Sequence, residues 1–205
     1  MRDVRVTLDQ NNSSDALIAI DDMDTLTLDE IIRSKVCEAV QRVESMAAPQ
    51  FVDEGYIFGD ESPAIYWGAN ESGWIILPED FMRLVAFKMS DWEQILYSAI
   101  SPADPLYAKQ SSRYKGIRGN VQKPVCAIVN RPEGKVLEFY SCNSEEAYPV
   151  IATYRPYPKI ENDSVDISER CYTAVVYMTA ALVAATYGDN DKFTAMTELS
   201  KSMIQ

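Results

Sequence analysis

The chain has 205 residues, an ordinary hydrophobic content of 47% and a formal net charge of −12, which fits one large or two small globular domains. It contains no histidine, which excludes Ser-His and Cys-His catalysis and zinc sites that use histidine. We expect no signal peptide, because residues 1–15 lack an apolar stretch, and no membrane span, because the longest apolar run, 171–185, is shorter than about 18 residues. The four cysteines form no CxxC pair, so free thiols are expected.

Residues 1–25 have the pattern of an N-terminal arm. Val4, Val6 and Leu8 alternate with polar residues, which predicts a strand, and a turn cluster at 11–14 precedes a possible second strand at 16–20. Because a lone hairpin is only marginally stable in water, we expect the arm to rest on the protein's own body or on a neighbouring subunit.

The next segment begins with a strong helix-start signal. Thr27 and Glu30 form a T-x-x-E capping box, and Leu26 and Ile31 are spaced as a hydrophobic staple. Apolar residues then recur at helical spacing, at positions 32, 36, 39, 40, 43 and 47, until Pro49 ends the pattern. We therefore predict a long helix with one face in a core.

Residues 63–154 have the pattern of a β-rich insertion, so the predicted fold class is α+β. Short apolar runs predict strands at 64–68, 72–78, 84–92, 125–130, 135–142 and 148–154, with a hairpin turn at 131–134. Turns separate these runs, which favours a small antiparallel sheet. A short helix is expected at 93–100.

A basic segment lies inside this insertion. Residues 105–132 hold six of the 19 bases and none of the 31 acids: Lys109, Arg113, Lys115, Arg118, Lys123 and Arg131. Tyr107, Tyr114 and Ile117 alternate with these bases. A long loop of this composition either stays solvated or binds an acidic partner, and the aromatic and apolar residues favour binding. The loop proper is expected at 105–124.

The C-terminal residues 155–205, together with 26–62, are predicted to form a helical bundle. Asp166 and Glu169 have the spacing of a second cap, Gly188 is placed to stop that helix near Tyr187, and Asp189 or Asp191 is placed to cap a last helix. The short link makes the two helices antiparallel. The first of them is apolar on almost every face, so it must be surrounded by its own core or by another chain.

Motifs for enzyme chemistry are few. No phosphate-binding GxxxxGK[ST] or GxGxxG occurs, and the G-x-x-G of KGIRGN (115–120), which in some folds clamps a nucleic-acid backbone, is equally typical of a turn. The acidic residues Asp53, Glu54, Asp60 and Glu61 show no metal or acid–base spacing. We therefore expect no enzyme activity, no catalytic residue, no metal and no cofactor.

Two segments and the order of elements resemble the head-to-tail adaptor proteins of short-tailed bacteriophages, including the crAss-like group. The segments are W-I-I-L-P-E-D-F-M-R-L-V-A-F-K-M-S-D-W at 74–92, and a closing helix, Gly/Asn/Asp turn and shorter final helix at 171–204. The likeness spans about 26–47 and 74–203. Such proteins are also called connector, head-completion or tail-tubular ring proteins.

The resemblance implies a structural protein of the virion, located at the head–tail junction and assembled in the host cytoplasm. Such a protein forms a ring, commonly twelvefold, that extends the DNA channel below the portal and carries tail components. Its expected partners are further copies of itself, the portal, other ring or tail proteins and DNA passing without sequence readout, with no membrane.

Charge segregation is compatible with this function. An acidic channel lining would repel the DNA backbone, while a basic loop could bind the acidic flank of the next subunit or of the portal. The residues expected at that interface are Lys109, Arg113, Tyr114, Lys115, Arg118 and Lys123. An alternative is a module that binds nucleic acid or a phosphorylated partner through KGIRGN. An enzyme that uses Asp, Glu, Tyr or Cys ranks third.

Overall fold

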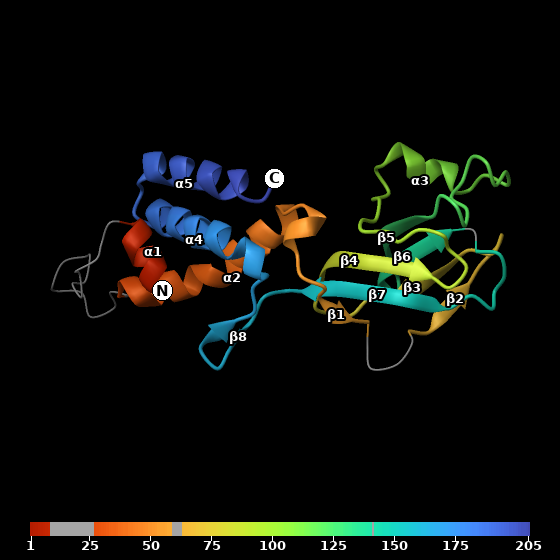
Figure 1. Cartoon of the computed structure of the whole chain (residues 1–205), viewed down its shortest axis with the longest axis horizontal. Helices are drawn as coiled ribbons and strands as arrows, with labels where there is room; N and C mark the ends of the chain where they lie inside the picture. The colour runs from red at the N-terminus through yellow and green to blue at the C-terminus, as the bar shows by residue number, and fades with distance from the viewer. Residues whose placement is uncertain (9–26, 59–62, 141) are drawn as a thin grey trace. The chain divides into compact units, whose positions relative to one another are not determined.

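A computed structural model describes residues 1–8, 27–58, 63–140 and 142–205. The fold is α+β, and the chain forms two compact units (Figure 1). Unit 1 comprises Met1–Asp53 and Tyr157–Gln205, and unit 2 comprises Glu54–Pro156. The sequence pattern put the boundaries at 62/63 and 154/155, whereas the structure has them at 53/54 and 156/157. Unit 2 begins earlier because the short strand β1 (Tyr56–Ile57) pairs with β7 (Pro149–Pro156).

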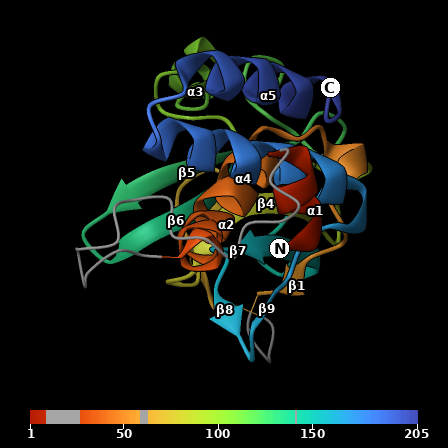
Figure 2. The ribbon, with the colours of Figure 1, turned by 90° about the vertical axis from the view of Figure 1, so that its left-hand side faces the viewer.

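Unit 1 is built on three helices: α2 (Leu28–Met46), α4 (Tyr172–Thr186) and α5 (Asn190–Ser202). Figure 1 and Figure 2 show α4 between α2 and α5, which explains its apolar composition on most faces. The predicted capping box of α2 is confirmed, since the Thr27 N–H donates to Glu30 Oε2 at 2.7 Å and the Glu30 N–H donates to Thr27 Oγ1 at 3.4 Å. Leu26 of the predicted staple lies outside the described residues.

The predicted strand at the N-terminus is wrong, because Arg2–Thr7 form a helix, α1. Val4 and Leu8 are four residues apart, so both lie on one helix face, where they pack against α2 and α4 in a shared core. Val6, which a strand would place beside them, is 53% exposed. Arg5 of α1 also pairs with Asp29 of α2 at 2.6 Å. The second predicted strand, 16–20, lies outside the described residues.

The predicted Asp166 and Glu169 cap is also wrong. A short 3-10 helix, η2 (Glu169–Cys171), precedes α4, and α4 itself has no side-chain cap. The N–H groups of this turn are satisfied from a distance instead: Ser168 donates to the buried Glu44 carboxylate at 2.7 Å and Glu169 donates to Asp53 at 3.1 Å. Carboxylates more than 100 residues away in the chain have taken the role of the local cap.

The turn that joins α4 to α5 is formed as predicted. Gly188 has φ +77, the left-handed conformation that suits glycine after a helix. Of the two candidate caps, Asp189 is used, since its Oδ1 accepts from the Lys192 N–H at 3.0 Å. Unit 1 also contains the 3-10 helix η1 (Pro49–Phe51) and a small hairpin, β8 (Ile160–Glu161) with β9 (Ser164–Val165).

Unit 2 contains two antiparallel sheets. One has the order β1-β7-β4, where β4 is Phe81–Met89. The other has the order β2-β3-β6-β5, with strand bounds Ile65–Trp67, Gly73–Ile76, Gly134–Tyr140 and Val125–Arg131 respectively. Side chains from both sheets form one core, which includes Ile75, Leu137 and Phe139 from the second sheet and Phe81, Phe87 and Tyr154 from the first.

The helix predicted at 93–100 is absent, and a helix is found further along, at α3 (Pro105–Lys109). Residues 93–100 are extended instead, because their backbone pairs with exposed sheet edges. Leu96 exchanges two hydrogen bonds with Phe87 of β4, and Ile100 bonds to Cys126 and Ile128 of β5. Asp104 caps α3 by accepting from the Leu106 N–H at 2.8 Å.

Candidate partner-binding loop

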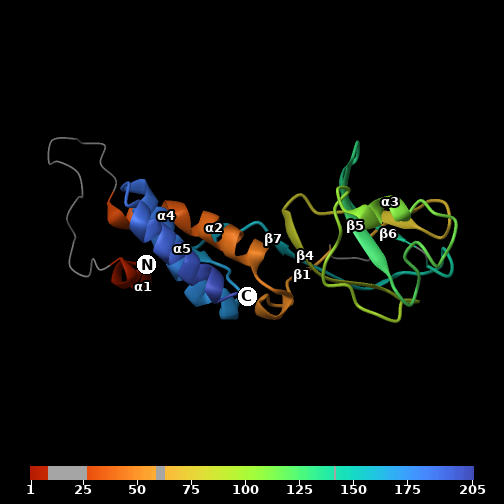
Figure 3. The same ribbon diagram turned by 90° about the horizontal axis from the view of Figure 1, so that it is seen from above.

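The basic loop, defined as residues 105–124, begins with α3 and returns to the edge strand β5. Figure 1 and Figure 3 show α3 lying over β5 and β6. Five of the six predicted interface residues are exposed on this loop: Lys109, Arg113, Tyr114, Lys115 and Lys123. The apolar side chain of Ile117 is 55% exposed beside them and Tyr114 is 57% exposed. The loop therefore presents cations and apolar groups together.

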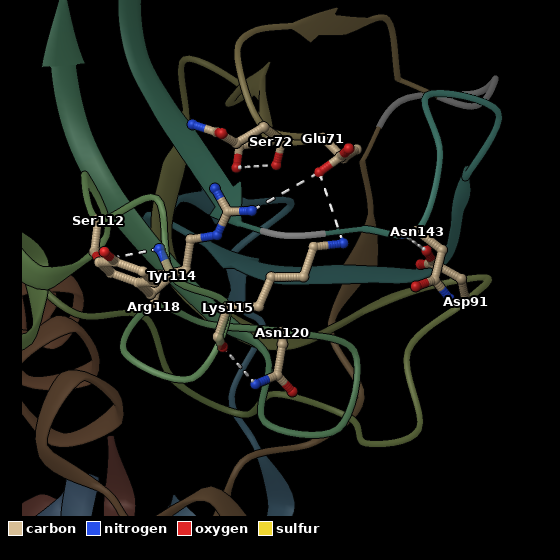
Figure 4. A network of polar contacts seen from close by, with 10 residues as sticks. Glu71, Ser72, Asp91, Ser112, Tyr114, Lys115, Arg118, Asn120 and Asn143 are labelled. Carbon is tan, nitrogen blue, oxygen red and sulfur yellow. Dashed lines mark hydrogen bonds and ion pairs between the residues drawn. The ribbon is translucent and has the colours of Figure 1, made fainter.

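Arg118, the sixth predicted interface residue, is buried. Its side chain is 3% exposed, and its Nη2 lies 3.8 Å from Glu71 Oε2 in the β2–β3 turn. Lys115 approaches the same carboxylate at 4.0 Å, and Figure 4 shows both cations directed at Glu71. Because it is enclosed within unit 2, Arg118 holds the loop in place and is not a surface contact.

Glu138 of β6 connects both ends of the basic segment 105–132 to the sheet. Its Oε2 accepts hydrogen bonds from the Tyr107 hydroxyl at 3.2 Å and the Tyr140 hydroxyl at 2.7 Å. Its Oε1 accepts from Arg131 Nη2 at 2.6 Å and Nε at 3.0 Å. Tyr107 lies near the start of the segment and Arg131 at its end, so one carboxylate holds both.

The surroundings of Glu138 keep the two phenols protonated. Burial, and then the neighbouring Glu138, raise the pKa of Tyr107 and of Tyr140. A protonated phenol donates to the carboxylate and keeps its own lone pairs as acceptors. The Arg131 guanidinium lies 4.0 Å from the centre of the Trp74 ring, which supports it from the other side.

Gln110 holds the middle of the loop. Its side-chain oxygen accepts from the Gly119 N–H at 2.8 Å, and its side-chain nitrogen donates to the Leu106 carbonyl at 2.8 Å. A Cβ at position 119 would lie 3.0 Å from Val125, so any larger residue here would require Val125 to shift by a few tenths of an ångström. At Gly116 a Cβ would meet nothing within 4 Å. The second glycine of KGIRGN therefore serves packing, and its N–H is already occupied.

The exposed cations of the loop have few acidic partners of their own. Within the described ranges, Lys109, Arg113 and Lys123 lie in no ion pair, although the chain as a whole is acidic. Arg113 instead donates to the Tyr114 hydroxyl at 2.8 Å, with its guanidinium 4.9 Å from that ring's centre. These cations are therefore free to pair with acidic groups of a partner.

The sequence indicated the exposed cations but missed the residues that hold them. Tyr107, Gln110 and Glu138 were not among the candidates. The only signal for Glu138 is a charged residue between Leu137 and Phe139 in an apolar strand, which alternation alone assigns to an exposed face. Of its three partners, Tyr107 could not be found because it depends on how α3 crosses the sheet, whereas Tyr140 lies two residues along the same strand and Arg131 lies on the paired strand β5.

Among the described residues, no group of three or more Cys, Asp or Glu side chains is arranged to hold a metal ion. The four cysteines are free. Asp60 and Glu61 of the acidic cluster lie outside the described residues. No helix in the described ranges combines the length and the apolar character needed to cross a membrane.

Comparison with models of known protein families finds no match, and comparison with curated proteins finds none either.

Proposed function

We propose that the chain is a structural docking protein whose basic loop binds an acidic protein surface. The resemblance to head-to-tail adaptor proteins suggests the setting: copies of this chain would form an adaptor ring between the portal and the tail of a short-tailed phage. The helices of unit 1 would form the bundle of such an adaptor, and unit 2 its β-rich insertion. The proposal assigns no catalytic step to any residue.

The observation that carries the proposal is a loop that is held by internal hydrogen bonds and ion pairs, yet leaves Lys109, Arg113 and Lys123 in no ion pair with the described residues. Glu138, Gln110 and Glu71 each hold a different part of it. A loop ordered before binding loses less conformational entropy when it docks, so its contacts contribute more fully to affinity. A loop that only solubilised the protein would need none of these internal bonds.

Apolar exposure favours a protein partner. Leu106, Tyr114 and Ile117 are each more than 40% exposed between the cations. Aromatic and apolar side chains surrounded by arginine are typical of protein interfaces, where they become desolvated. Unit 1 contains 18 of the chain's 31 acids and only 9 of its 19 bases, so a further copy would offer an acidic surface.

The nucleic-acid alternative is less well supported. A G-x-x-G clamp needs backbone N–H groups directed at a phosphate, but the Gly119 N–H is buried and bonded to Gln110. Arg118, between the two glycines, is enclosed as well. Only the outer cations remain for a phosphate backbone.

The test is charge reversal on the exposed part of the loop. The double variant Arg113→Glu/Lys123→Glu should keep the fold but lose assembly onto the portal protein encoded by the same genome, as seen by negative-stain microscopy and sedimentation velocity. Lys135→Glu/Lys159→Glu is the control, because it changes charge equally at exposed positions outside the loop. Normal assembly by the loop variant would overturn the proposal. Tight, steeply salt-dependent binding of DNA by the free chain would favour the alternative.

A further inference from the structure

A pocket of about 430 Å³ lies between α3 and the outer face of the four-stranded sheet, within unit 2. The β2–β3 turn contributes Asn70 and Ser72, α3 and the residues after it contribute Tyr107 and Ser111, and β6 contributes Glu138 and Tyr140. Its volume is within the range of about 300–1,000 Å³ that is usual for small-molecule sites. The docking function proposed above makes no use of this pocket.

The charges of the pocket cancel. Among the described residues that line it, Glu138 and Arg131 are the charged ones, and they form an ion pair with each other at 2.6 Å. An anion would meet the carboxylate and a cation would meet the guanidinium. A ligand without net charge is therefore the best match.

The pocket-lining groups that remain available for a ligand include both hydrogen-bond donors and acceptors. The Tyr107 and Tyr140 hydroxyls donate to Glu138, so their oxygens remain as acceptors. Arg131 uses Nε and Nη2 on Glu138, which leaves Nη1 as a donor. The Asn70 side chain, which makes no hydrogen bond to another described residue, supplies one of each kind.

Apolar surface makes up more of the pocket lining than polar surface does, and most of it comes from the tyrosine rings. Apart from the tyrosine rings, the alanines at 69 and 108 are the apolar contributions to the lining from the described residues. A purely aliphatic ligand would leave Arg131 Nη1, the Asn70 amide and the two phenol oxygens without partners, which is costly. A ligand with several hydroxyl groups can donate to the phenol oxygens and accept from Arg131 and Asn70 at the same time.

We propose that this pocket binds a neutral, polyhydroxylated small molecule of the size of a single sugar ring. Arg131 and Glu138 are positioned by each other and by Trp74, so the polar groups are in place before the ligand arrives. The tyrosine rings supply the flat surface on which a sugar ring can lie.

The experiment is a titration of the isotope-labelled full chain followed by two-dimensional NMR. The probes are glucose, galactose, mannose and N-acetylglucosamine, with inorganic phosphate and free lysine as charged controls. We expect at least one sugar to produce saturable shifts in the backbone amides of residues 69–72, 107–111 and 138–140. Neither charged control should do so.

Matched variants separate binding from folding. Tyr140→Phe and Tyr107→Phe each remove one acceptor from the pocket and should weaken sugar binding about fivefold, the effect of one lost hydrogen bond. Tyr97→Phe removes a hydroxyl from an exposed tyrosine outside the pocket and should leave affinity unchanged. Absence of saturable shifts with all four sugars would overturn the proposal, as would shifts away from the pocket or saturable binding of phosphate alone.

Discussion

Replacing Glu138 by Gln tests how strongly one buried carboxylate holds the basic loop. The substitution keeps the size of the side chain but removes the charge that accepts from Arg131, and it places an amide nitrogen where an oxygen now accepts from two phenols. The Glu138 side chain is only 9% exposed, so water can replace these partners only in part.

The expected loss of stability in Glu138→Gln depends on how exposed Glu138 and its partner Arg131 are. Breaking a fully buried ion pair costs about 3–5 kcal/mol. Arg131 is 33% exposed and can be partly rehydrated, which reduces that figure. We therefore expect Glu138→Gln to lower the free energy of unfolding of unit 2 by about 2–3 kcal/mol.

The positions of the tryptophans allow the unfolding of unit 2 to be measured separately from that of unit 1. Trp67, Trp74 and Trp92 are the three tryptophans of the chain, and all lie in unit 2. Tryptophan fluorescence during urea unfolding thus reports unit 2 alone, and the midpoint should fall by about 1 M. Circular dichroism at 222 nm, which is dominated by the helices of unit 1, should change little.

Glu133→Gln is the control, because Glu133 is an exposed carboxylate in the same β5–β6 hairpin. Its effect should be within about 0.5 kcal/mol of zero. If Glu138→Gln unfolds at the same urea concentration as the wild type and this control, the network around Glu138 does not hold the loop and the reasoning is wrong.

Three further outcomes are expected. Gly119→Ala should destabilise unit 2 by about 1–3 kcal/mol, because its Cβ would lie 3.0 Å from Val125. Gly116→Ala is the control and should have no effect, because a Cβ there meets nothing within 4 Å. Equal urea midpoints for the two variants would contradict this. Thr27→Ala should lower the stability of unit 1 by about 1 kcal/mol, measured at 222 nm, and Thr27→Ser should restore it. Burial raises the pKa of the Cys126 thiol to about 12 in the folded protein, whereas the thiol of the unfolded chain ionises near pH ~8.5. The stability of unit 2 should therefore fall as pH rises above about 8.5. A urea midpoint that stays unchanged from about pH 8.5 to 10.5 would refute this.

Local signals were the reliable part of the sequence. The Thr27–Glu30 box, the Gly188 stop and the hairpin at 131–134 each depend on residues within four positions of one another, and the structure has all three. The same kind of signal failed at Asp166, where distant carboxylates satisfied the backbone instead. It also failed at the N-terminus, where the five residues 4–8 of alternating pattern are too few to separate a strand from a helix.

The sequence by itself determined the α+β class, the positions of most strands and the separation of charge, because composition and short-range periodicity carry that information. Only the tertiary structure decided which cations of the basic loop are available. Arg118 and Arg113 are chemically equivalent in the sequence, but Arg118 is enclosed beside Glu71, 47 residues away, while Arg113 faces solvent. Burial depends on which distant segments meet, and no local pattern records that.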